Sequence, residues 1–90
     1  MKRRKIDSAL ISKGFERNEG SKHILYSMEI EGKIAVVTRM SRGSSHHEIG
    51  KKILSKMAKQ LHISNQQFLE YIECKYTYKE YYSYVKKNYL

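Results

Sequence analysis

Residues 23–40, HILYSMEIEGKIAVVTRM, contain two short apolar runs separated by a Glu-Gly pair. The first run alternates between apolar residues at even positions and mostly polar residues at odd positions, which is the period of a half-buried strand. The second run is short and rich in β-branched residues, so the two runs together predict an antiparallel hairpin. This hairpin decides the fold class because it places a sheet in the middle of the chain.

The turn of this hairpin receives two conflicting predictions. Turn chemistry favours a two-residue loop made of Glu31 and Gly32. A three-residue loop instead places the apolar residues of both runs on one face, and in the second run these are Ile34, Val36, Thr38 and Met40. We favour the three-residue loop, because a slip by one residue would expose the whole apolar set of one strand.

Helical periodicity flanks the hairpin on both sides. Before it, apolar residues at helical spacing predict a helix over residues 4–13, ended by Gly14. After it, capping-box patterns that begin at Ser45, Ser64 and Thr77 predict three helices, the longest over residues 46–61. A helix, antiparallel strands and further helices predict an α+β domain, with the first and main helices packed on one face of the sheet.

Net charge is the strongest feature of the composition. The 90 residues include 18 Lys and Arg against 9 Asp and Glu, a formal charge of +9. This excess is spread along the chain and predicts a polyanionic partner such as nucleic acid. The length suits one domain, 1–90. With a single cysteine, Cys74, and no apolar run of membrane-spanning length, we expect a cytoplasmic protein without membrane contact.

His23 opens the first strand of the hairpin, and alternation places it on the face opposite Tyr26, away from the core. In the favoured register it lies across from Ser41, with Arg39 diagonally within reach. Histidine, with an ordinary pKa of about 6.5, can take a proton near neutral pH. RNA cleavage without a metal needs such a base and cations at the phosphate. The candidates are His23, Lys22, Arg39 and Arg42, and a surface histidine without a catalytic role is the alternative.

Four segments carry a resemblance to a known family: GFERNEGSKHILY (14–26), TRMSRG (38–43), ILSKMAKQLHIS (53–64) and QFL (67–69). Together they resemble the HicA-type mRNA interferase toxins of bacterial toxin–antitoxin pairs. The resemblance implies a double-stranded-RNA-binding-domain-like α-β-β-β-α core over residues 1–63, with a third strand at about 15–18 and a helical extension over 64–90. It also implies that His23 is catalytic, that Gly20 and Ser21 shape its turn, and that a HicB-like antitoxin is the partner.

Family members commonly carry a doubled histidine and a Pro-x-His segment, where this chain has Lys22 and Met40-Ser41-Arg42. The leading interpretation is a metal-free endoribonuclease that acts on mRNA as a toxin. The alternative is a non-catalytic RNA- or DNA-binding module of the same fold. A third interpretation is a structural subunit whose Tyr-rich end docks a larger protein.

Three further groups of residues have alternative interpretations. The N-terminal basic residues are candidates for binding an RNA backbone, or else form a solvated charge cluster; they are Arg3, Arg4 and Lys5. The group His46, His47, Glu48 and His62 is better explained by helix capping than by a metal site, because adjacent side chains on a helix point in different directions. We therefore expect no metal and no other cofactor. Most of the eight tyrosines lie between residues 71 and 89, where core packing or self-association is favoured over partner docking or base stacking.

Overall fold

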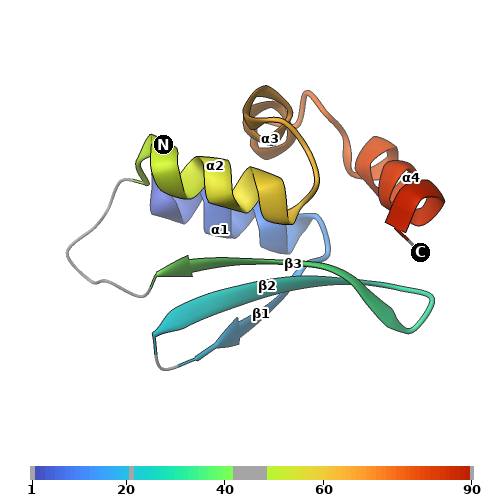
Figure 1. The fold of residues 1–90 in the computed structure, drawn as a ribbon, viewed down its shortest axis with the longest axis horizontal. Helices are drawn as coiled ribbons and strands as arrows, with labels where there is room; N and C mark the ends of the chain where they lie inside the picture. Colours follow the sequence, from blue (N-terminus) through green and yellow to red (C-terminus); the bar gives the residue numbers. More distant parts are fainter. Residues whose placement is uncertain (1, 21, 42–48, 90) are drawn as a thin grey trace.

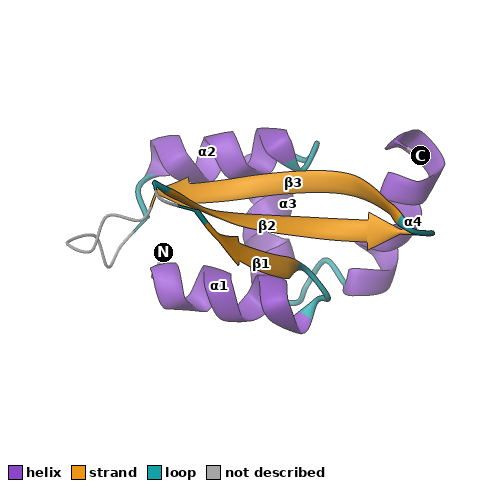
Figure 2. Ribbon diagram, turned by 90° about the horizontal axis from the view of Figure 1, so that it is seen from below, coloured by secondary structure: helices purple, strands orange, loops and turns teal. Residues whose placement is uncertain are grey.

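A computed structural model describes residues 2–20, 22–41 and 49–89 of the chain. Three strands form one antiparallel sheet in the order β1-β2-β3. All the described helices lie on one side of this sheet, and none of them covers its other face (Figures 1 and 2). The elements are α1 (Arg3–Ser12), β1 (Glu16–Glu19), β2 (His23–Ile30), β3 (Lys33–Ser41), α2 (Lys51–Gln60), α3 (Asn65–Ile72) and α4 (Tyr78–Tyr89). The expected α+β class is confirmed.

The first helix ends where its sequence predicts. Gly14 has a φ of +88°, which a residue without a side chain adopts at little cost. Its N–H donates to the carbonyl of Ile11, and the N–H of Phe15 donates to the carbonyl of Leu10, both at 3.0 Å. These bonds satisfy carbonyls that the helix end would leave unpaired. The chain is thereby turned into β1, the strand at residues 16–19 that the family resemblance implied at about 15–18.

The hairpin contains both predicted features, joined by a β-bulge. Glu31 and Gly32 form a two-residue turn, each with positive φ, and Ile30 pairs with Lys33. A register shift then follows at Met28 and Glu29, so that Tyr26 pairs with Thr38 as the three-residue loop required. An inserted residue in one strand accounts for such a shift.

The bulge also corrects the prediction for Ile34. This residue pairs with Glu29 before the register shift and is 61% exposed, whereas we expected it on the core face. Val36, Thr38 and Met40 come after the bulge and are buried as predicted.

The helix expected to be the longest, α2, begins later than predicted and has 10 residues, two fewer than the 12 of α4. The helix α2 starts at Lys51, and Ile49 and Gly50 before it are not helical, so the predicted start at residue 46 is wrong. Gly50 serves as N-cap with an extended backbone, which avoids the cost of about 1 kcal/mol that glycine adds inside a helix. The predicted capping pattern from Ser45 to Glu48 lies outside the described residues.

The last two helices begin at the predicted capping boxes. In α3 the N–H of Gln67 donates to Ser64 Oγ at 3.1 Å, and the N–H of Ser64 donates to Gln67 Oε1 at 3.0 Å. In α4, Thr77 and Glu80 exchange the same two bonds at 3.2 Å. Side chains from α1, α2, α3, α4 and the sheet share one buried cluster. Within the described ranges, no helix combines the length and apolar character that crossing a bilayer requires.

Candidate functional site

The turn between β1 and β2 fixes the backbone at His23. The N–H of Gly20 donates to the carbonyl of His23 at 2.8 Å, next to the paired residues Glu19 and Ile24. A Cβ atom added at Gly20 would lie 3.1 Å from that same carbonyl oxygen. Gly20 therefore permits the close approach that starts β2. Lys22 is exposed in this turn, and Ser21 lies outside the described residues.

His23 and Arg39 line one groove, as the predicted register required. His23 pairs with Ser41, and Arg39 pairs with Leu25, so both project from the face of the sheet opposite the buried Tyr26. The groove has a volume of about 180 Å³, and α2 supplies the rest of its lining with Ile53, Lys56 and Gln60.

Gln60 connects α2 to the edge strand β3. Its Oε1 accepts a hydrogen bond from Thr38 Oγ1 at 2.8 Å and another from the backbone N–H of Arg39 at 3.1 Å. The Thr38 hydroxyl belongs to a side chain only 1% exposed, so this amide oxygen satisfies a buried donor. The two bonds hold the Lys56 face of α2 against the strand that carries Arg39.

Sequence reasoning missed Lys56 and Gln60. Together with Ile53 they recur at i, i+3 and i+7, so helical periodicity places them on one face. Because two of the three residues on that face are polar, helical periodicity alone predicts that the face is exposed to solvent. Its contact with the edge of β3 depends on how α2 crosses the sheet, which no local pattern specifies.

The candidate basic residues at the N-terminus lie at a different place. Arg3 and Arg4 line a second cavity of about 500 Å³ on the helix-covered side of the sheet. Lys5 is directed elsewhere, and its Nζ lies 3.8 Å from a carboxylate oxygen of Glu73. The structure thus places Arg39 at one site and Arg3 and Arg4 at another, whereas Lys5 and Lys22 line neither. Arg42 lies outside the described residues.

The second cavity contains a tightly bonded carboxylate. Tyr26 Oη donates to Asp7 Oδ1 at 2.5 Å, and Arg17 Nε lies 3.4 Å from the same oxygen. Burial of Tyr26, and then its hydrogen bond to Asp7, raise the pKa of the phenol well above its ordinary value. Tyr26 therefore stays protonated to higher pH than an exposed tyrosine, and its hydroxyl donates to Asp7.

The remaining histidine and tyrosine candidates have structural contacts. The His62 ring stacks on Tyr89 with centroids 4.0 Å apart, and its carbonyl accepts a hydrogen bond from Tyr84 Oη. Tyr71 and Tyr81 are fully buried, which confirms core packing for these two. No group of three or more His, Cys, Asp or Glu within residues 2–20, 22–41 and 49–89 is placed to hold a metal ion. His46, His47 and Glu48 are outside these ranges.

Comparisons of this chain with protein-family models, with curated proteins and with solved structures find no match.

Proposed function

We propose that this protein binds RNA and cleaves it at the groove that contains His23. The observation that carries the proposal is the placement of one imidazole beside the cationic side chains of Arg39 and Lys56. An imidazole can accept the proton of a ribose 2′-hydroxyl, and two cations can stabilise the charge that develops on phosphoryl oxygens. The net charge of +9 favours the approach of such a polyanion.

The proposed reaction is an internal transesterification. His23 accepts the 2′-hydroxyl proton while the 2′ oxygen forms a bond to phosphorus. The bond between phosphorus and the 5′ oxygen breaks, leaving a 2′,3′-cyclic phosphate and a 5′-hydroxyl. Arg39 keeps its protons and serves as a charge stabiliser. The leaving oxygen takes its proton from Lys56, the other cationic donor in the groove.

The family resemblance adds a biological setting to the proposal. The element order begins α-β-β-β-α with the helices on one side of the sheet, which supports the proposed double-stranded-RNA-binding-domain-like arrangement. In that setting the protein is an mRNA-cleaving toxin, and a HicB-like antitoxin inhibits it by covering the His23 groove.

Purified protein incubated with RNA oligonucleotides tests the proposed reaction. Wild-type protein is expected to produce 2′,3′-cyclic phosphate ends, and His23→Ala is expected to abolish cleavage. His62→Asn is the matched control, because it removes an imidazole outside the groove and asparagine tolerates the positive φ of 63° found there. Cleavage by His23→Ala at the wild-type rate would rule out the mechanism.

A second candidate function is RNA or DNA binding without cleavage. It is favoured by the presence of a single histidine among the described residues that line the groove. This alternative predicts binding that weakens steeply as salt rises, with a smaller salt slope after Arg39→Gln or Lys56→Gln. His23→Ala would leave that affinity unchanged. Fluorescence anisotropy over a salt series, together with the cleavage assay, separates the two functions.

A further inference from the structure

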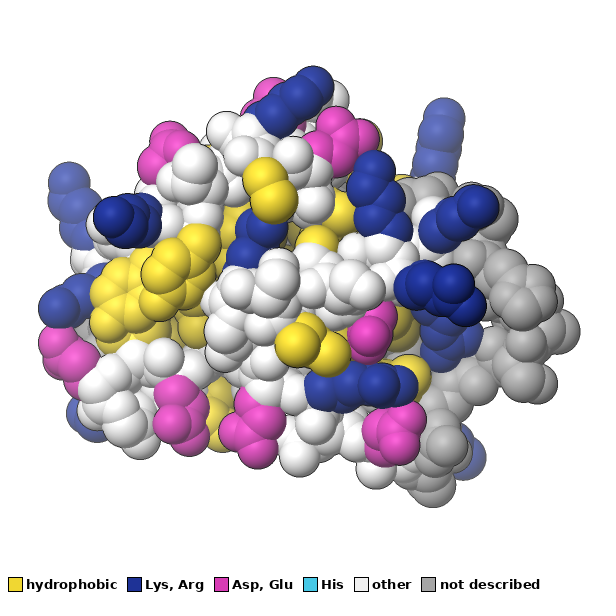
Figure 3. Space-filling view, turned by 180° about the vertical axis from the view of Figure 1, so that it is seen from behind, with side chains coloured by type: hydrophobic (Ala, Val, Ile, Leu, Met, Phe, Trp, Pro, Cys, Tyr) yellow, Lys and Arg dark blue, Asp and Glu magenta, His cyan; other side chains and the backbone are white. Residues whose placement is uncertain are grey.

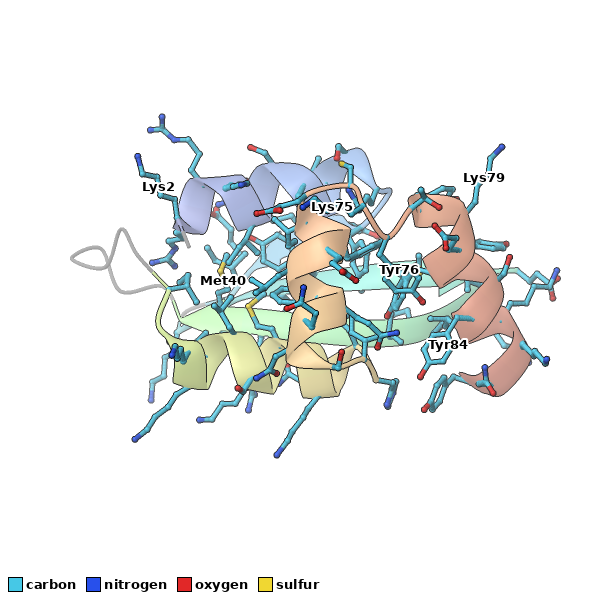
Figure 4. All side chains as sticks on the ribbon, turned by 90° about the horizontal axis from the view of Figure 1, so that it is seen from above. Lys2, Met40, Lys75, Tyr76, Lys79 and Tyr84 are labelled. Atoms are coloured by element: carbon cyan, nitrogen blue, oxygen red, sulfur yellow. The ribbon has the colours of Figure 1, made fainter. Side chains whose placement is uncertain are left out.

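The cavity of about 500 Å³ at the start of α1 is a second potential ligand site. Its floor includes Ile24 and Met40, which are 7% and 1% exposed. These residues adjoin His23 and Arg39 along their strands and therefore face the opposite side of the sheet. Figure 4 shows Met40 between α1 and α2, and Lys2 at the N-terminal end of α1. The cavity is thus separate from the His23 groove.

The lining of this cavity carries an excess of positive charge. Lys2, Arg3 and Arg4 come from the start of α1, and Arg17 comes from β1. The lining has one carboxylate, Asp7, which Arg17 and the Tyr26 hydroxyl already contact. Figure 3 shows Lys and Arg side chains gathered at the end of the molecule where α1 begins. An anion that entered the cavity would meet several cations and no competing free carboxylate among these lining residues.

These cations lie at the N-terminal end of α1, where positive charge is electrostatically unfavourable. The N-terminal end of a helix carries partial positive charge and favours acidic residues. In α1 the first turn has no acidic residue, and no side chain caps the N-terminus. Like charges placed there destabilise the unliganded helix, and a bound anion would reverse this effect. The charge pattern is therefore better suited to a bound anion than to the empty helix.

We infer that the cavity binds a nucleotide with a terminal phosphate. A terminal phosphate carries a charge of about −1.5 to −2 at neutral pH, which suits several converging cations. The volume of the cavity lies in the range of small-molecule sites and leaves room beyond the phosphate for a base. The base occupies the rest of the cavity, above the largely buried Ile24 and Met40, and the phosphate is bound by Lys2 and Arg4. None of these residues lines the His23 groove, so the inference does not depend on RNA cleavage.

Calorimetric titration with AMP, adenosine and inorganic phosphate tests this site. AMP is expected to bind more tightly than either part alone. The double variant Lys2→Gln/Arg4→Gln is expected to weaken AMP binding by about tenfold or more, because charge-assisted hydrogen bonds are lost. Both residues are exposed, so the substitutions remove no core packing.

The matched control is Lys52→Gln/Lys79→Gln, which removes the same charge from exposed positions outside the cavity. It is expected to change AMP binding by less than about twofold, in keeping with charge screening over distance. Equal effects of the two double variants would overturn the site, because they would indicate a general charge effect. Absence of AMP binding would also overturn it, and so would inorganic phosphate binding as tightly as AMP.

Two sources of the nucleotide are distinguished with RNA oligonucleotides that carry a 5′-phosphate or a 5′-hydroxyl. If the ligand is an RNA end, the 5′-phosphate increases affinity in wild-type protein but not in Lys2→Gln/Arg4→Gln, and AMP competes with it. If the ligand is a free nucleotide, AMP binds equally well in the presence of either oligonucleotide. Both results support the site. Normal AMP binding by wild-type protein that does not cleave RNA would show that only the proposed reaction had failed.

Discussion

At the scale of single residues, Gln60 is the side chain that connects the two walls of the groove, α2 and β3. One amide oxygen accepts from the buried Thr38 hydroxyl and from the Arg39 N–H. Sequence reasoning correctly placed His23 and Arg39 near each other because strand register follows from the apolar pattern. It missed Gln60 and Lys56 because a glutamine or lysine on a helix has the same local pattern whether it faces solvent or an adjacent strand edge.

Gln60→Leu is expected to destabilise the fold by about 1–3 kcal/mol, since it leaves the Thr38 hydroxyl buried without its acceptor. Gln66→Leu is the control, because Gln66 is exposed and its bond to Glu70 is long, at 3.4 Å. Chemical denaturation of both variants measures the difference. A loss from Gln60→Leu no larger than that from the control would mean that the Thr38 and Arg39 bonds contribute nothing to stability.

At the scale of elements, the sequence predicted the helix ends that a single local pattern determines. It did not predict the hairpin register or the start of α2, where two patterns favour different structures. The capping boxes at Ser64 and Thr77 and the glycine after α1 act within one helical turn, so the sequence alone located these helix ends. The hairpin required a compromise between turn chemistry at Glu31 and the core face of β3. A bulge allows the two-residue turn and the buried apolar face to coexist. The sequence analysis considered only two regular registers, so it did not predict the bulge. The start of α2 was misplaced because the apolar pattern extends across Gly50, where glycine favours an N-cap over a helix interior.

Removal of one capping side chain tests how much α3 depends on its local pattern. Ser64→Ala is expected to cost about 1 kcal/mol of unfolding free energy, because the N–H of Gln67 loses its acceptor. Ser83→Ala provides the comparison, since Ser83 is exposed inside α4, where alanine favours the helix by a few tenths of a kcal/mol. Urea unfolding of the two variants checks the prediction, and equal midpoints would contradict it.

At the scale of the whole molecule, tyrosines unite the C-terminal helices with the rest of the core. Tyr26 of β2, Tyr71 of α3 and Tyr81 of α4 are all fully buried. Tyr81 Oη donates to the carbonyl of Leu61 at 2.9 Å, whereas Tyr71 Oη has no hydrogen-bond partner among the described residues. Burial is the largest cause of the raised pKa of all three phenols. The folded state therefore disfavours ionisation of these three buried tyrosines.

This core predicts a loss of stability at alkaline pH. Tyrosines of the unfolded chain ionise near pH 10, and the buried ones ionise only at higher pH. Their contribution to stability is fully present below about pH 10 and declines as pH rises through the raised values. Circular dichroism and tyrosinate absorbance, followed together, are expected to show exposed tyrosines ionising first and the buried ones only as the helices unfold. Ionisation of all eight in one step near pH 10, with the helices intact, would contradict this prediction.

Two variants identify the buried phenols as the cause of alkaline unfolding. Tyr71→Phe removes an ionisable group and a buried hydroxyl without a partner among the described residues, so unfolding is expected to move to higher pH. The same change should stabilise the protein at neutral pH by about 1 kcal/mol, because an unsatisfied polar group is lost from the core. Tyr78→Phe, at a side chain 44% exposed, is expected to leave the transition where it is. If both variants behaved alike, ionisation of the core would not be the event that unfolds the protein.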